Sequence, residues 1–171
     1  MNPLSKKVCL LGDFAVGKTS LMRRFLYHAF DDKYISTIGV KVSRKLVAVN
    51  TDAGVVELTM MVWDLAGSEE FDQMRASYLR GATGAVLVCD LTRPETLTNL
   101  RSYVADMRQV SPDARFVVAA NKLDLIGQRQ IDEEQIRQFA RSLPAAYFLA
   151  SAKIGDAVEM LFRELGRSLV S

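Results

Sequence analysis

The chain has 171 residues, of which 49% are apolar and 25% charged, and its 22 Lys and Arg against 20 Asp and Glu leave a formal charge of +2. This length and composition predict one globular domain with its own hydrophobic core. Because the charges nearly balance and no run of like charges occurs, the sequence argues against a nucleic acid or a membrane surface as an electrostatic partner.

Cysteine positions and the chain ends bear on the cellular compartment. Cys9 and Cys89 each stand inside an apolar run, which predicts reduced core thiols of a cytosolic protein rather than a disulfide. The sequence holds no secretory signal and no stretch long enough to span a bilayer. Asn2 and the absence of a terminal cysteine mean that neither myristoylation nor prenylation is encoded. We expect a cytoplasmic protein, recruited to membranes only through partners or a tail not present here.

Short apolar runs alternate along the chain with longer helical patterns, which is typical of βαβ units around a mostly parallel sheet. Runs such as GAVLVC and FVVAA are apolar at every position, as expected for strands covered by helices on both faces. Strands are predicted at residues 6–11, 40–49, 55–63, 84–90, 116–121 and 147–149. Helices are predicted at residues 17–27, 71–81, 94–110, 132–142 and 156–168.

Turn and cap residues refine this order. Residues 50–54 supply Asn, Asp and Gly between two runs rich in Val, which predicts a β-hairpin with one antiparallel strand at a sheet edge. Pro94 and Asp132 stand where a first turn or an N-cap is favoured. The predicted fold class is therefore α/β, with a six-stranded, mostly parallel sheet and helices on both faces.

The segment GDFAVGKT satisfies the pattern G-x-x-x-x-G-K-[ST] between a predicted strand and a predicted helix. Successive backbone N–H groups at such a helix start surround an anion, and the helix dipole favours negative charge there. Lys18 places a cation against the outer phosphates, and the Thr19 hydroxyl is suited to bind Mg²⁺. An ordinary glycine-rich turn is the alternative, and the motif alone indicates only a nucleoside triphosphate. The predicted binding residues are Gly12, Asp13, Phe14, Ala15, Val16, Gly17, Lys18, Thr19 and Ser20.

The segment WDLAG ends the third predicted strand. Asp64 is placed to hold Mg²⁺ through water, and the Gly67 N–H is placed to approach a terminal phosphate because no side chain intervenes. An Asp at a strand end followed by Ala-Gly is often only a turn. Its position one hairpin after the phosphate motif supports the functional interpretation, since the two strands are then neighbours in the sheet.

Two further segments follow the last two predicted strands, at the edge where such sheets bind ligands. The Asp124 carboxylate can accept hydrogen bonds from the N1–H and the exocyclic amine of guanine, a pair of donors that adenine lacks. Asn121 can tie loops together, the Lys122 stem can lie on the base, and the Ala152 N–H can donate to the guanine O6. The predicted base site comprises Asn121, Lys122, Asp124, Ser151, Ala152 and Lys153.

With these motifs in this order, the chain resembles the Ras superfamily over nearly its whole length, and most closely the Rab branch. The resemblance rests on GDFAVGKTSL, YISTIGV, WDLAG, YLRGA, NKLD and SAK. It implies a single P-loop G domain over residues 1–171, which binds GTP or GDP with Mg²⁺ and hydrolyses GTP. Thr37 would join Mg²⁺ only when the third phosphate is present, Phe30 would pack against guanine, and Tyr34 would close over the phosphates.

The resemblance also implies partners. Effectors, exchange factors and GTPase-activating proteins would bind through switch regions near residues 31–42 and 64–80, and the chain would be a monomer. By the same resemblance, the residues expected to serve catalysis are Lys18, Thr37, Gly67 and Ser68.

Three departures from the Rab pattern qualify the expected activity. Ser68 stands where a glutamine usually orients the attacking water, and its side chain is too short for that task. Phe14 is bulky where a partner's arginine would approach the third phosphate. Lys41 and Val42 replace an acidic and an aromatic residue, so no particular Rab effector can be carried over.

These residues leave three functions to compare. The first is a regulated switch that hydrolyses GTP slowly, and the second is a nearly inactive GTP-bound scaffold, which Ser68 and Phe14 favour. The third, a P-loop ATPase or nucleotide kinase, is disfavoured by NKLD and by the absence of an evident lid for a second substrate.

Overall fold

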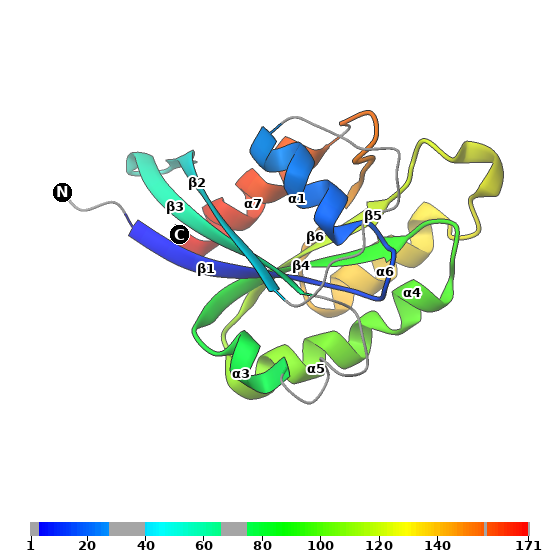
Figure 1. Cartoon of the computed structure of the whole chain (residues 1–171), viewed down its shortest axis with the longest axis horizontal. Helices are drawn as coiled ribbons and strands as arrows, with labels where there is room; N and C mark the ends of the chain where they lie inside the picture. The colour runs from blue at the N-terminus through cyan, green and yellow to red at the C-terminus, as the bar shows by residue number, and fades with distance from the viewer. Residues whose placement is uncertain (1–3, 28–39, 66–74, 156, 171) are drawn as a thin grey trace.

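The computed structural model describes residues 4–27, 40–65, 75–155 and 157–170. Over these residues the chain forms a six-stranded sheet with helices on both faces (Figure 1). The strands are β1 (Leu4–Leu11), β2 (Val40–Thr51), β3 (Gly54–Leu65), β4 (Ala82–Asp90), β5 (Arg115–Asn121) and β6 (Ala146–Leu149). The helices are α1 (Lys18–Tyr27), α3 (Arg75–Leu79), α4 (Glu95–Thr98), α5 (Leu100–Val110), the 3-10 turn η1 (Ile126–Gln128), α6 (Glu133–Ser142) and α7 (Val158–Val170).

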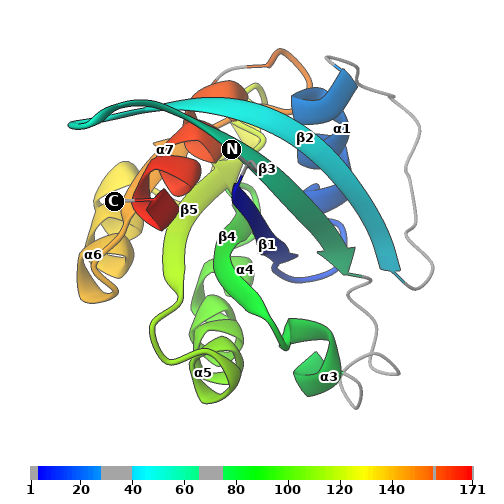
Figure 2. The ribbon, with the colours of Figure 1, turned by 90° about the vertical axis from the view of Figure 1, so that its left-hand side faces the viewer.

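The sheet has the strand order β2-β3-β1-β4-β5-β6, and the predicted six-stranded, mostly parallel sheet is confirmed. Among the described strands, only β2 and β3 pair in antiparallel orientation, and they form the long hairpin seen in Figure 2, with β2 at the sheet edge. The hairpin is tighter than predicted, because Thr51 pairs with Gly54 and leaves only Asp52 and Ala53 in the turn. Gly54 has φ +117°, a backbone conformation that glycine adopts without strain.

Each face of the sheet has its own core. Helices α1 and α7 cover one face, where the rings of Phe25 and Phe162 stack with centroids 4.0 Å apart. Helices α3, α5 and α6 cover the other face. Cys9 and Cys89 are fully buried free thiols, and burial raises the pKa of each to about 12, so both stay protonated. The prediction that they are core residues is confirmed.

Helix boundaries differ from prediction in places. The single helix predicted over 94–110 is two helices, because Asn99 breaks the regular pattern and the Ser102 N–H bonds to the Asn99 carbonyl only three residues back. The predicted N-cap is confirmed at Asp132, where Gln135 completes a capping box. The helix predicted over 156–168 is α7, which begins and ends two residues later. Of the helix predicted over 71–81, residues 71–74 lie outside the described residues and α3 ends at Leu79.

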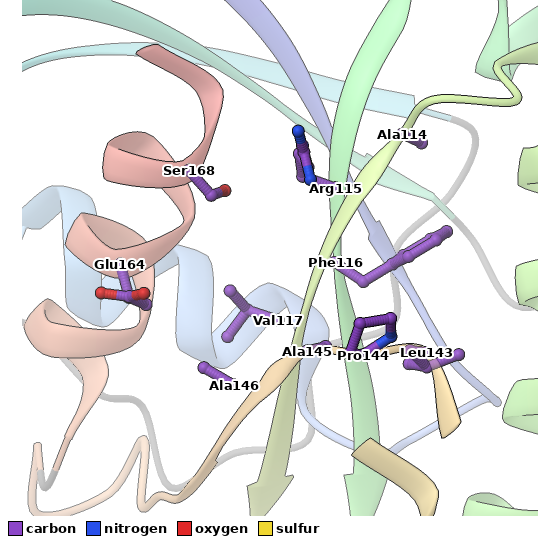
Figure 3. A pocket seen from close by; sticks show the side chains of 10 residues that line it. All are labelled: Ala114, Arg115, Phe116, Val117, Leu143, Pro144, Ala145, Ala146, Glu164 and Ser168. Atoms are coloured by element: carbon purple, nitrogen blue, oxygen red, sulfur yellow. The ribbon is translucent and has the colours of Figure 1, made fainter. Parts of the chain in front are cut away.

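No helix in the described ranges combines the length and the apolar content that crossing a bilayer requires. One cleft of about 230 Å³ opens beside the amino-terminal end of β5. Figure 3 shows Arg115 of β5 and Glu164 and Ser168 of α7 around it, with residues 143–146 closing one side. Ligands of such sheets bind at the carboxyl ends of the strands, so this cleft lies at the wrong end of β5 for the predicted site.

Candidate nucleotide site

The predicted motifs come together at one edge of the sheet. Strand β1 lies at the centre with β3 on one side and β4 on the other, and the loop after β1 leads directly into α1 (Figure 1). The segments that follow β5 and β6 lie on the same side because these strands are parallel to β1. This is the position where doubly wound sheets bind their ligands.

Lys18 folds back over the phosphate loop. Its Nζ donates to the Gly12 carbonyl at 2.8 Å and to the Asp13 carbonyl at 3.1 Å. Lys18 itself is only 7% exposed. A buried ammonium group beside the loop is suited to attract a phosphate.

The next three carbonyls of the loop are held by side chains from other parts of the chain. Arg93 Nη2 donates to the Phe14 carbonyl at 2.8 Å. Lys122 Nζ donates to the Ala15 carbonyl and Asn121 Nδ2 to the Val16 carbonyl, each at 3.0 Å. All five carbonyls from Gly12 to Val16 are thus engaged by side-chain donors. These contacts fix the backbone of the loop, and successive backbone N–H groups in such a loop are suited to bind an anion.

The loop geometry requires glycine at Gly17. Its φ is +102°, and a Cβ at this position would lie 2.2 Å from Asn121 Nδ2. Ala15 and Lys122 also have positive φ angles, of 63° and 71°, although they carry side chains. Strained residues held by their surroundings are typical of binding sites, and here the two are bonded to each other.

A hydroxyl and a carboxylate meet beside the phosphate loop. The Thr19 hydroxyl, at the start of α1, donates to a carboxylate oxygen of Asp64, near the end of β3. Asp64 is fully buried and Thr19 is 8% exposed. Both are oxygen ligands of the kind that Mg²⁺ prefers, so the two residues fit a magnesium site.

Asp90 organises two of the cations that hold the loop, and sequence analysis missed this role. It ends β4, is 1% exposed, and lies 2.8 Å from Lys122 Nζ and 3.1 Å from Arg93 Nε. Burial alone would raise the pKa of Asp90, but hydrogen bonds from Lys122, Thr92 and Arg93 together hold it below its ordinary value. The carboxylate is therefore ionised at neutral pH and orients both cations.

The side chain of Asp13 is committed to contacts within the protein. Its carboxylate accepts from Asn99 Nδ2 at 2.7 Å and from the Tyr103 hydroxyl at 3.1 Å. The side chain therefore anchors the phosphate loop to α5, and only the backbone of Asp13 is left to contact a nucleotide. Phe14 is 52% exposed, so its backbone, rather than its ring, forms part of the phosphate loop.

The predicted base-reading carboxylate is supported by a buried serine. Ser151 is fully buried, and its hydroxyl donates to Asp124 Oδ1 at 2.7 Å. The Ala152 N–H, predicted to donate to the guanine O6, donates instead to Asn121 Oδ1 at 3.1 Å in this structure. Asn121 therefore binds both the segment predicted to hold the phosphates and the segment predicted to hold the base.

Arg24 also contacts the base loop, and no sequence motif indicated it. Its Nε donates to the Ala152 carbonyl at 2.8 Å, and its Nη2 donates to the Lys153 carbonyl. Ser20, one of the predicted binding residues, lies half-buried in the first turn of α1. Five predicted site residues lie outside the described residues, and their roles remain predictions: Phe30, Tyr34, Thr37, Gly67 and Ser68.

Comparison with known proteins agrees with this geometry. The model of the Ras family matches residues 7–171. The Ras-related protein Rab-22A of Homo sapiens is 36% identical over 166 residues, which cover 96% of this chain and 84% of that protein. The Ras-related protein Rab-1D of Dictyostelium discoideum is 34% identical over 164 residues, which cover 95% of this chain and 78% of that protein. The chain therefore belongs to the Ras family, as a Rab-like small GTPase with a GTP-binding switch domain.

Proposed function

We propose that the chain is a Mg²⁺-dependent guanine-nucleotide switch that hydrolyses GTP slowly. The observation that carries this proposal is the position of Asn121, whose amide binds the Val16 carbonyl at 3.0 Å and the Ala152 N–H at 3.1 Å. One side chain thus joins a phosphate-binding loop to a base-binding loop. A guanine nucleotide, with phosphates at one end and a base with two adjacent donors at the other, fits both.

Different residues of the chain would bind the phosphates and the base of this ligand. The N–H groups of the loop Gly12 to Gly17 bind the phosphates, and Lys18 adds a positive charge against the outer ones. Asp124 accepts from the N1–H and the amine of guanine, which selects guanine over adenine. For the Ala152 N–H to reach the guanine O6, it must share or leave its bond to Asn121.

Thr19 and Asp64 would hold Mg²⁺, and Thr37 would join them only when the third phosphate is present. When bound, Mg²⁺ neutralises charge on the outer phosphates. As ligands, the Thr19 hydroxyl and the Asp64 carboxylate would supply the oxygen atoms that Mg²⁺ prefers, and their present hydrogen bond shows that the two groups already lie side by side.

Slow hydrolysis is proposed because Ser68 cannot orient a water molecule as glutamine does. The same residue, together with the exposed Phe14 ring, favours the second candidate, a nearly inactive GTP-bound scaffold. A single-turnover hydrolysis trace separates the two. We expect slow, complete conversion of bound GTP, whereas a flat trace would favour the scaffold.

We also propose that the whole chain is one domain, monomeric and cytoplasmic, and that effectors and regulators bind near residues 31–42 and 64–80. The described ends of these two segments are neighbours, since Val40 pairs with Leu65 and Lys41 with Asp64 across the hairpin. A partner that contacts residues 40–42 would therefore also contact residues 64–65.

Competition between GTP and ATP for the purified protein tests the proposed function. We expect GTP and GDP to displace a labelled guanine nucleotide at concentrations where ATP has no effect, and we expect the protein to copurify with GDP or GTP. Equal displacement by ATP, or a copurifying adenine nucleotide, would overturn the proposal.

Replacing the two threonines separately tests the magnesium site. Thr19→Ala should weaken both GDP and GTP binding and make GDP release insensitive to chelation of Mg²⁺, since Thr19 is a ligand in both states. Thr37→Ala should weaken capture of a GTP-selective partner far more than it weakens GDP binding. Isothermal titration with and without Mg²⁺ measures both, and equal loss of GDP affinity in the two variants would contradict the assignment.

Arg93→Met should speed GDP release about tenfold, because the Phe14 carbonyl loses a charged donor and its peptide can rotate. Stopped-flow release of a fluorescent GDP analogue measures the rate. Arg101→Met is a matched control, since Arg101 is an exposed arginine that packs over the Phe139 ring of α6. An unchanged release rate in Arg93→Met would mean that the other four carbonyl contacts suffice.

A further inference from the structure

Arg24 lies on α1, beyond the phosphate-binding residues and outside every nucleotide motif. Its guanidinium donates to two successive carbonyls of the base loop, those of Ala152 and Lys153. The planar fork of an arginine suits such a double contact, and a lysine cannot reproduce it. One side chain of the phosphate-side helix therefore fixes two peptide units of the loop that follows β6.

The held segment is a closed turn. The Gly155 N–H bonds to the Ser151 carbonyl at 2.7 Å, and Gly155 has φ +86°. A Cβ on Gly155 would lie 3.6 Å from Arg24 Cδ, so the arginine side chain packs directly against this turn. The position of Arg24 and the shape of the turn are thus linked by packing as well as by hydrogen bonds.

A continuous chain of hydrogen bonds leads from Arg24 to the base-reading carboxylate. The Lys153 carbonyl and the Ile154 N–H belong to one planar peptide, so they point in opposite directions. Arg24 holds the carbonyl, and the N–H donates to Ser151 Oγ at 3.1 Å. The same hydroxyl donates to Asp124 Oδ1 at 2.7 Å. Hydrogen bonds in such a chain polarise and orient one another.

We infer that Arg24 is a positioning residue for guanine selectivity, which acts on Asp124 through the Lys153–Ile154 peptide and Ser151. The inference rests on the proposed function, in which Asp124 reads guanine. Without Arg24 the peptide is free to rotate, the Ser151 hydroxyl loses its fixed orientation, and the carboxylate no longer meets both guanine donors well. The phosphate loop, which is held by other side chains, is unaffected.

The test compares GDP with inosine diphosphate (IDP), which keeps the N1–H but lacks the exocyclic amine. In Arg24→Met, GDP affinity should fall about tenfold and IDP affinity only about twofold, because the contact to the amine depends most on the carboxylate orientation. Arg24→Lys should restore part of the preference for GDP over IDP, since an ammonium can still donate to one carbonyl. Thermal melts of each variant confirm that it is folded.

Two further variants sharpen the result. Arg163→Met also removes an arginine that holds a backbone carbonyl, that of Ala48 at 3.0 Å, and it should leave both affinities unchanged. Combining Arg24→Met with Ser151→Ala should change the GDP preference by less than the sum of the single effects, since both act on the same chain of bonds.

The outcomes separate the inference from the proposed function. If Arg24→Met lowers GDP and IDP affinity equally, or if its effect adds fully to that of Ser151→Ala, Arg24 does not act through Asp124 and the inference fails. If the parent protein does not prefer GDP to ATP, the proposed function itself fails. Should Arg24→Met not fold, Arg24→Lys carries the same comparison, with a smaller fall in the GDP preference.

Discussion

Replacing Asp124 by asparagine is expected to move the nucleotide preference from guanine to xanthine. The asparagine amide places a donor where guanine needs an acceptor, and the mismatch of buried polar groups costs about 1 to 3 kcal/mol or more, which is roughly fivefold to more than a hundredfold in affinity. Xanthine presents a carbonyl where guanine presents its amine, and so accepts from the new amide. Competition of GDP against xanthosine diphosphate measures the change.

The structure supplies a reason why this variant should fold. The Ser151 hydroxyl donates to Asp124 Oδ1, and an asparagine carbonyl can accept the same bond. Asp132→Asn is a matched control, because Asp132 caps α6 away from the base loop and asparagine caps a helix equally well. If Asp124→Asn binds GDP as tightly as the parent, the base-site assignment is wrong.

Ser68→Gln is expected to accelerate single-turnover GTP hydrolysis by about tenfold to a hundredfold, the order of effect that correct placement of a reacting group contributes. The side chain at residue 68 would then reach the attacking water, which the serine cannot do. Nucleotide affinity should stay nearly unchanged, because the phosphate loop and Lys18 are untouched. Rapid quench with radiolabelled GTP measures the step.

A second substitution should add to this gain. Reducing Phe14 to glycine or serine removes a 52% exposed ring, while its carbonyl stays bound to Arg93, so the loop should keep its shape. Ser102→Gln, at an exposed serine on α5, is a matched control that should not change the rate. Brisk hydrolysis by the unmodified protein, or no response to Ser68→Gln, would mean that the chain positions its water by another route.

The fold could be predicted from the sequence because each strand and turn is marked by residues that are close together in the chain. Strands that are apolar at every position must be covered on both faces, and a turn of Asn, Asp and Gly between two Val-rich runs makes a hairpin. The phosphate motif was equally readable, since its glycines and lysine act within eight consecutive residues. The break at Asn99 was not predicted, because neither Gly nor Pro stands at this point of the chain to mark a helix end.

The supporting residues of the site could not be predicted for a different reason. Arg24 meets Ala152 across 128 residues of chain, and Arg93 meets Phe14 across 79. An isolated arginine on a helix or in a turn is usually a solvated surface residue, so nothing in its sequence neighbourhood marks these two. Only the folded arrangement brings each of them to a backbone carbonyl.

The outward contacts of the phosphate loop tie ligand binding to the stability of the whole domain. Their donors come from α1, from the turn after β4 and from the end of β5, so the loop has its binding shape only when these elements are all folded together. A nucleotide that binds the native chain but not the unfolded chain adds about 2.7 kcal/mol of stability when its concentration is about a hundred times its Kd. At about a thousand times its Kd, it adds about 4 kcal/mol. The nucleotide-free chain is then the form most open to unfolding and proteolysis, and a partner that bound this form would stabilise it against both.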